Sequence, residues 1–105
     1  MSGFSCPRDP TAFGLKPNVI DELIATAQRN GVQKLVLFGS RARGTYSRAS
    51  DIDLGVYGGN VREFHAEAEE TVPTLLRFDV IDMGRPLSPD FRRQIEAGVV
   101  LYEEI

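Results

Sequence analysis

Apolar positions along the chain follow two spacings, one typical of helices and one typical of strands. Between residues 17 and 30 the apolar side chains recur at helical spacing, which predicts an amphipathic helix with a single buried stripe. The members of that stripe are Val19, Ile20, Leu23, Ile24 and Ala27. The next run, residues 33–38, is short and almost continuously apolar, which is typical of a buried strand.

The same patterns divide the remainder of the chain, with glycine and proline marking the boundaries. The further expected elements are a short helix over 40–46, a strand from 50 to 57, a helix over 61–76 that Pro73 kinks or ends early, a strand over 77–83, a helix from 88 to 97 and a strand over 99–102. No internal repeat is visible. Strands that alternate with helices in this way indicate one small α/β domain.

The strand that begins at Ser50 carries two carboxylates. Asp51 and Asp53 are two residues apart, so they share a face, with Cα atoms about 6.6 Å apart, while apolar residues occupy the other face. Two like charges this close repel each other, and folding alone gives no reason for the arrangement. A divalent cation such as Mg²⁺ removes the repulsion, and it is usually held by one or two carboxylates together with substrate phosphates. A nucleoside triphosphate is therefore the natural co-ligand.

A glycine-serine turn precedes that strand and is typical of a phosphate cradle. Gly39 allows a close approach of the backbone, and Ser40 offers a hydroxyl and an N–H. Arg41 and Arg43 add positive charge and are expected to contact phosphates, although a structural salt bridge is an equal alternative for Arg43. Ser50 either contacts the ligand or only sets the start of the strand. The dipeptide alone is common in turns, so the prediction depends on its combination with the carboxylates.

A third carboxylate is expected from the strand over 77–83. Asp79 and Asp82 are three residues apart, so they point to opposite faces and only one can join the first pair. Phe78 and Val80 resemble the core-facing side, which leaves Asp79 on the carboxylate face. Asp82 lies near the end of the strand, where it can reach solvent. We therefore favour Asp79 over Asp82.

Composition agrees with a single small domain. The chain has 105 residues, of which 42% are hydrophobic and 26% charged, and a formal net charge of -3. That charge argues against direct nucleic-acid binding. Cys6 is the only cysteine, and no apolar run is long enough to cross a bilayer, so a cytoplasmic protein without a membrane partner is expected. Residues 1–16 lack periodicity and are predicted to be a flexible N-terminal arm before a domain over 17–105.

The two central segments resemble the signature of a known superfamily. Residues 39–44 read GSRARG, and after five further residues 50–54 read SDIDL. This string resembles the motif of the DNA polymerase beta-type nucleotidyltransferases. It is most similar to the minimal, MNT-type members that are commonly encoded beside a HEPN-domain protein. The likeness runs from about residue 17 to the end. It implies an α/β (α+β) palm fold, with a small mixed sheet of about four strands packed by helices on one face.

The resemblance also implies an activity. Asp51 and Asp53 would hold the ion that grips the triphosphate, and together with Asp79 they would hold a second, catalytic Mg²⁺. Gly39 and Ser40 would bind the phosphates. The expected reaction moves AMP from ATP to a hydroxyl, namely a tyrosine of a cognate HEPN partner, so that this chain acts as the antitoxin of a toxin–antitoxin pair.

Two alternatives from other functional classes remain open. One is a non-catalytic nucleotide-binding module that neutralises its partner by contact alone. The other is a transferase that acts on a small hydroxylated molecule such as an aminoglycoside. His65, the only histidine, is expected to be a surface residue rather than a proton carrier or ligand, because it lies among solvated acids.

Overall fold

Four strands form one mixed sheet in the order β3-β2-β1-β4. The fold comes from a computed structural model that describes residues 13–47 and 49–104. In chain order the elements are α1 (Pro17–Arg29), β1 (Lys34–Phe38), α2 (Ser40–Arg43), β2 (Ile52–Tyr57), α3 (Val61–Thr71), β3 (Phe78–Asp82), α4 (Pro89–Glu96) and β4 (Val99–Glu103). Each element predicted from the pattern is present, and the mixed α+β architecture is confirmed.

The pairing of the strands decides which residues meet at the edge of the sheet. β1 is antiparallel to both β2 and β4, whereas β2 and β3 are parallel and are joined through α3. The end of β1 therefore lies beside the beginnings of β2 and β3. In this register Phe38 is opposite Asp53, and Asp53 is opposite Asp79.

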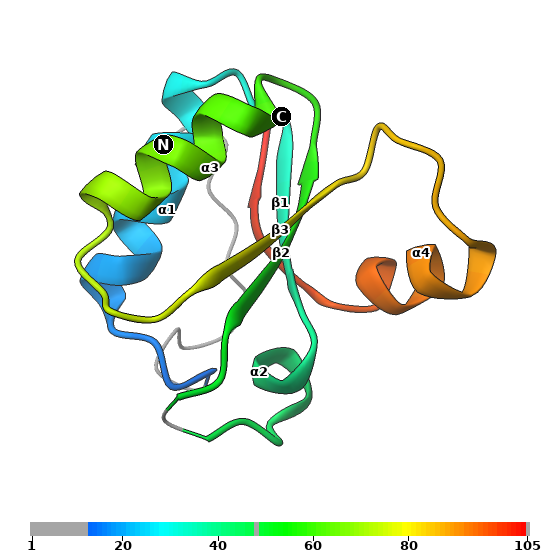
Figure 1. Cartoon of the computed structure of the whole chain (residues 1–105), viewed down its shortest axis with the longest axis horizontal. Helices are drawn as coiled ribbons and strands as arrows, with labels where there is room; N and C mark the ends of the chain where they lie inside the picture. Colours follow the sequence, from blue (N-terminus) through cyan, green and yellow to red (C-terminus); the bar gives the residue numbers. More distant parts are fainter. Residues whose placement is uncertain (1–12, 48, 105) are drawn as a thin grey trace.

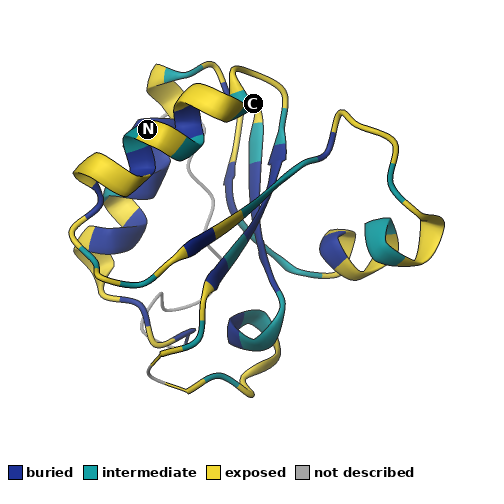
Figure 2. Ribbon diagram, in the orientation of Figure 1, coloured by how far each residue is buried: buried dark blue, intermediate teal, exposed yellow. Residues whose placement is uncertain are grey.

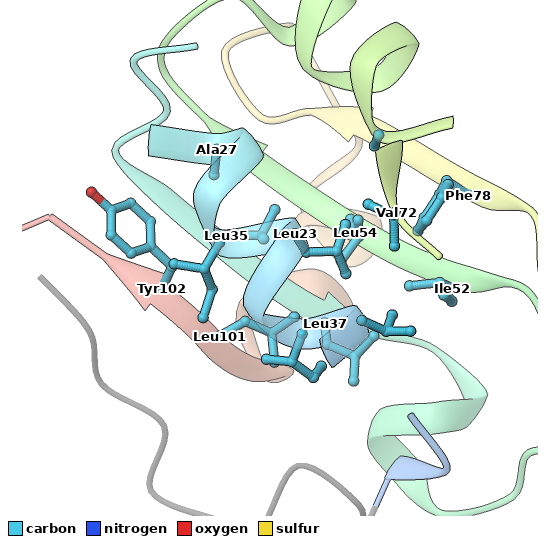
Figure 3. Close-up of a cluster of buried hydrophobic side chains, with 14 of the residues drawn as sticks. Leu23, Ala27, Leu35, Leu37, Ile52, Leu54, Val72, Phe78, Leu101 and Tyr102 are labelled. Carbon is cyan, nitrogen blue, oxygen red and sulfur yellow. The ribbon is translucent and has the colours of Figure 1, made fainter. Parts of the chain in front are cut away.

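Helices α1 and α3 cover one face of the sheet, as Figure 1 shows with the sheet seen nearly edge-on. The apolar stripe predicted for α1 is buried there together with alternate residues of the strands, among them Leu35, Leu37 and Leu54. Figure 3 shows these side chains between α1 and the sheet. Burial of this apolar area is the main favourable term for a domain of this size. Tyr102 of β4 belongs to the same core, so its ring packs within the protein.

Helix α4 lies on the opposite face, which corrects the expectation that helices cover only one face (Figure 1). Ile95 of α4 is buried against Phe38 and Met83 in a second, smaller apolar cluster. Phe91 meets Phe38 edge to face, with ring centroids 6.0 Å apart. The second face is apolar only where α4 covers it, and the carboxylates lie on its uncovered part.

The boundaries of the helices follow local chemistry. α3 begins after Asn60, whose side chain accepts a hydrogen bond from the Glu63 N–H, and α4 begins after Ser88, which accepts one from Phe91. α3 ends at Thr71, ahead of Pro73, so the helix stops five residues before the outer limit predicted from the sequence.

The predicted N-terminal arm, residues 1–16, needs a correction at its end. Residues 1–12, including Cys6, lie outside the described residues. Phe13 and Leu15 are each 3% exposed and belong to the main core, so the packed domain includes at least residues 13–16 (Figure 2). None of the described helices combines the length and the apolar character that spanning a membrane requires.

Candidate active site

Strand β2 and the residue directly before it carry two carboxylates on the uncovered part of the second face. Ile52 and Leu54 point into the main core and are fully buried, so Asp51 and Asp53 on either side of Ile52 point the other way. Asp53 is half-buried and Asp51 is exposed. The alternation predicted from the sequence is therefore present in the fold.

Strand β3 brings Asp79, and not Asp82, beside this pair. Asp79 is the register partner of Asp53 in the parallel ladder. Asp82 is opposite Val56 at the far end of the strand, where its carboxylate accepts a hydrogen bond from the Gly84 N–H at 2.9 Å. It also pairs with Arg85 at 3.6 Å. The sheet thus separates the two aspartates that the sequence left as alternatives.

The electrostatic environment of Asp53 reflects this convergence. Burial raises the pKa of the Asp53 carboxyl, and the negative charges of Asp79 and then Asp51 raise it further. The positive charges of Arg43 and Arg41 oppose that rise without cancelling it. The charges of two neighbouring aspartates therefore act on the Asp53 carboxylate.

The donor chemistry at this point fits a divalent cation. Carboxylate oxygens are hard ligands of the kind that Mg²⁺ prefers, and a cation offsets both the burial and the neighbouring negative charges that raise the pKa of Asp53. Within 13–47 and 49–104, no three His, Cys, Asp or Glu side chains are gathered tightly enough to form a ready ligand cluster. Asp51, Asp53 and Asp79 are the residues that could hold the ion, and their assignment as ligands stays a prediction.

Gly39 lies directly against the Asp53 carboxylate. Its backbone has φ 77° and ψ −153°, a conformation that side-chain-bearing residues rarely adopt. A Cβ atom at this position would lie 2.1 Å from Oδ2 of Asp53. The turn into α2 therefore requires glycine for two reasons, the backbone conformation and the space that Asp53 occupies. Ser40 follows as the first residue of α2 and is half-buried.

Arg41 has a role that the sequence did not predict. Its side chain is 1% exposed. The guanidinium donates from Nη1 to the Phe13 carbonyl at 2.9 Å, and from Nη2 and Nε to the Ser50 carbonyl at 2.9 and 3.2 Å. It also lies over the ring of Tyr46, 5.0 Å from the centroid. The side chain is held inward as a structural anchor, which corrects its interpretation as a phosphate contact.

The structure also distinguishes the roles of Arg43 and Ser50. Arg43 is exposed, and its charge acts on Asp53, so its position is compatible with a phosphate contact. The Ser50 hydroxyl accepts a hydrogen bond from the Ser47 N–H at 2.8 Å, and the Ser50 carbonyl is bound by Arg41. Ser50 therefore shapes the turn before β2, which favours the structural alternative for this residue.

The sequence analysis missed the residues that lock this loop. Phe13 and Tyr46 are far apart in the chain, and Arg41 joins the backbone of one to the ring of the other. Gly14 gives a further sign of the tight packing, because a Cβ there would lie 2.4 Å from the Tyr46 ring. No motif signals such a contact, since it depends on residues 28 positions apart meeting in space.

Comparisons with known proteins identify the family that shares this fold. The family model described as "Polymerase beta, Nucleotidyltransferase" matches residues 21–104. A crystal structure of the toxin–antitoxin MntA-HpeT in mutant form is similar, with a TM-score of 0.64, 22% identity, and coverage of 80% of this chain and 73% of that one. A crystal structure of a toxin–antitoxin with AMP-PNP has the same TM-score and coverage at 25% identity. No curated protein matches. The chain belongs to the polymerase beta-type nucleotidyltransferase family.

Proposed function

We propose that this chain is a Mg²⁺-dependent nucleotidyltransferase that moves AMP from ATP to a hydroxyl of a partner protein. Membership of the family supports nucleotidyl transfer. The observation that carries the finer proposal is that the sheet register brings Asp79 beside Asp53, next to the turn at Gly39. Such a site has the charge and the close backbone approach that a triphosphate with its metal ions needs.

Each residue of the site has a role in this proposal. Gly39 brings the phosphate-binding turn directly against the Asp53 carboxylate, and Ser40 donates its hydroxyl and N–H to phosphate oxygens. Arg43 places positive charge next to the triphosphate. Asp79 accepts or orients the proton of the acceptor hydroxyl. Two Mg²⁺ ions held by the three aspartates would supply charge neutralisation for the attacking and leaving oxygens. Catalysis then depends on positioning and electrostatics.

The acceptor is proposed from the solved relatives. Both similar structures are described as toxin–antitoxin proteins, and one is described with AMP-PNP, an adenine nucleotide analogue. The carboxylates lie on the part of the sheet that α4 leaves open, so an acceptor from another chain can approach them. We propose that the acceptor is a tyrosine of a HEPN-domain partner and that the chain acts as its antitoxin.

Transfer of label tests the proposal directly. The chain and the protein encoded beside it are incubated with ATP labelled at the α-phosphate, with and without Mg²⁺. Label is expected on the partner only with Mg²⁺, and Asp53→Asn should reduce it at least about 100-fold. Asp79→Asn should have a similar effect, and Asp82→Asn, at the far end of β3, serves as the matched control and should retain transfer.

Three outcomes would contradict the proposal. Undiminished transfer in Asp53→Asn would contradict the assignment of Asp53 as a ligand of Mg²⁺. Protection from the partner's toxicity without any label, unchanged in Asp53→Asn, would identify a binding module. Label on an added aminoglycoside and none on the partner would identify a small-molecule transferase.

A further inference from the structure

A hollow of about 840 Å³ lies along β3 towards its C-terminal end. It is formed by β3 itself, by the beginning of α3 and by the segment that leads from β3 to α4. The lining residues that matter for the argument are Arg62, Val80, Ile81, Asp82, Arg85 and Leu87. Neither the family motif nor the proposed transfer reaction uses this part of the molecule.

The outer edge of β3 forms one wall of the hollow and has no neighbouring strand among the described residues. The Arg77 carbonyl accepts a hydrogen bond from the Ile52 N–H at 2.8 Å, and the Met83 N–H donates to the Val56 carbonyl at 2.9 Å, so these residues bond towards β2. Backbone groups of a strand alternate between its two sides. The N–H and C=O of Val80 therefore face the open edge, where another strand can pair with them.

The side chains around this edge favour negative charge. Arg62 is exposed and forms no ion pair with any residue of 13–47 or 49–104. The Arg85 side chain is 81% exposed, and its ion-pair partner Asp82 also accepts the Gly84 N–H. On the α4 side, Ile81 and Leu87 offer partly exposed apolar surface.

We propose that the free edge of β3 binds an extended acidic segment of a partner protein, which adds to the sheet as a fifth strand. Side chains of an added strand alternate between the two faces of the sheet. Acidic side chains would therefore lie towards Arg62, and apolar ones towards Ile81 and Leu87. A nucleic acid lacks the alternating N–H and C=O groups that pair with Val80, so it cannot extend the sheet in this way.

The free edge of β3 also runs past one of the three carboxylates. Asp79 lies three residues before Asp82, about 10 Å along the strand, so a segment bound on this edge would pass close to Asp79. Delivery of the acceptor by this route rests on the proposed function, whereas binding itself does not.

Fluorescence anisotropy tests the binding, with the full chain and neither nucleotide nor Mg²⁺. The probe is a fluorescein-labelled peptide, Gly-Ser-Val-Glu-Val-Glu-Val-Gly-Ser. Two matched peptides carry lysine in place of glutamate, or N-methyl groups on the amides of alternate residues. The acidic probe is expected to bind, and each matched peptide should bind at least about tenfold more weakly, because each removes either the charge or the strand pairing.

Variants of the chain locate the site. The double variant Arg62→Glu with Arg85→Glu should bind the acidic probe at least about tenfold more weakly. It reverses two exposed charges without disturbing the core. Lys16→Glu reverses an exposed charge at a residue that does not line the hollow, and it should leave binding unaltered. Circular dichroism checks that each variant is folded.

The result that would overturn the proposal is equal binding of all three peptides, no binding of any, or no effect of the double variant. Sedimentation that shows a dimer lost in the double variant would assign the edge to a second copy of this chain instead. A chain that binds the probe but transfers no AMP would contradict only the proposed function, because binding is measured without nucleotide.

Discussion

Asp53 occupies a position where burial and two neighbouring carboxylates all oppose its negative charge. Its pKa in the folded chain is therefore raised above the value in the unfolded chain. A carboxyl shifted in this direction favours folding below its ordinary pKa, and that contribution is lost as the pH rises through the folded-state pKa. At neutral pH the charged side chain destabilises the fold, so stability alone gives no reason for an aspartate at this position.

Asp53→Asn is expected to raise the Tm at pH 7 by about 2–4 °C, because relief of repulsion at a half-exposed site is worth about 0.5 kcal/mol. The gain should shrink as the pH falls and vanish below about pH 3.9, where the native carboxyl is also uncharged. Thermal unfolding followed by circular dichroism at pH 3, 5 and 7 measures this. A lower Tm for the variant at pH 7 would contradict the argument.

Mg²⁺ provides the matching control for the same residue. An ion that binds only the folded chain raises its Tm with concentration. The wild type should show this rise, and Asp53→Asn should show little of it. An equal rise in both proteins would place the ion elsewhere.

Gly39→Ala should damage the site and the fold together. The substitution forces a side chain into φ 77° and places its Cβ 2.1 Å from the Asp53 carboxylate, so a loss of at least about 3 kcal/mol of stability is expected. Gly44→Ala is the comparison, because Gly44 also has positive φ, 81°, but its ψ of 12° lies in the milder left-handed region and a Cβ would have no neighbour within 4 Å. It should cost about 1 kcal/mol. Chemical denaturation measures both, and equal losses would show that the contact with Asp53 is unimportant.

At the scale of the element, the short helix α2 depends on the inward side chain of Arg41. The guanidinium holds two backbone carbonyls and covers the ring of Tyr46, so this residue fixes the loop between β1 and β2. Lysine cannot replace the planar fork with which Arg41 reaches both carbonyls. The loop in turn sets the position of Asp51 at the beginning of β2.

Arg41→Ala should therefore destabilise the chain by about 2–4 kcal/mol, because it removes a buried side chain and its hydrogen bonds to the buried Phe13 carbonyl and the partly buried Ser50 carbonyl. Arg43→Ala, two residues away and exposed, should change stability by no more than about 0.5 kcal/mol. If Arg43 contacts phosphate as proposed, its loss should instead raise the KM for ATP. Urea unfolding and steady-state kinetics separate the two residues. A KM effect for Arg41→Ala without loss of stability would reverse these roles.

The elements were predictable from the sequence because each depends on neighbours in the chain. Apolar spacing marked α1, Pro73 limited α3, and the alternation over 51–54 placed the two carboxylates on one face. The face pattern around Asp79 also separated it correctly from Asp82. The anchoring role of Arg41 and the burial of Phe13 could not be predicted, since both arise from contacts between distant residues.

At the scale of the whole molecule, the important feature is that helices cover the two faces of the sheet unequally. α1 and α3 cover one face fully, whereas α4 covers only part of the other (Figure 1). Helical spacing identifies an apolar stripe but not the face on which a helix will pack, which is why the place of α4 was not foreseen. The uncovered part holds the carboxylates, so the position of α4 determines how much of the sheet an acceptor can reach.

Gly55 permits that arrangement, since a Cβ there would lie 2.5 Å from Cγ2 of Ile95 in α4. Gly55→Ala should therefore lower the free energy of unfolding by about 1–3 kcal/mol through overpacking, and Ile95→Ala by about 2–4 kcal/mol through the cavity it leaves. Because the new methyl group occupies part of that cavity, the double variant should lose about 0.5–2 kcal/mol less than the sum. Urea unfolding of the four proteins measures the coupling. Simple additivity would mean that α4 does not pack on Gly55 in solution and that the second face is more open than the structure has it.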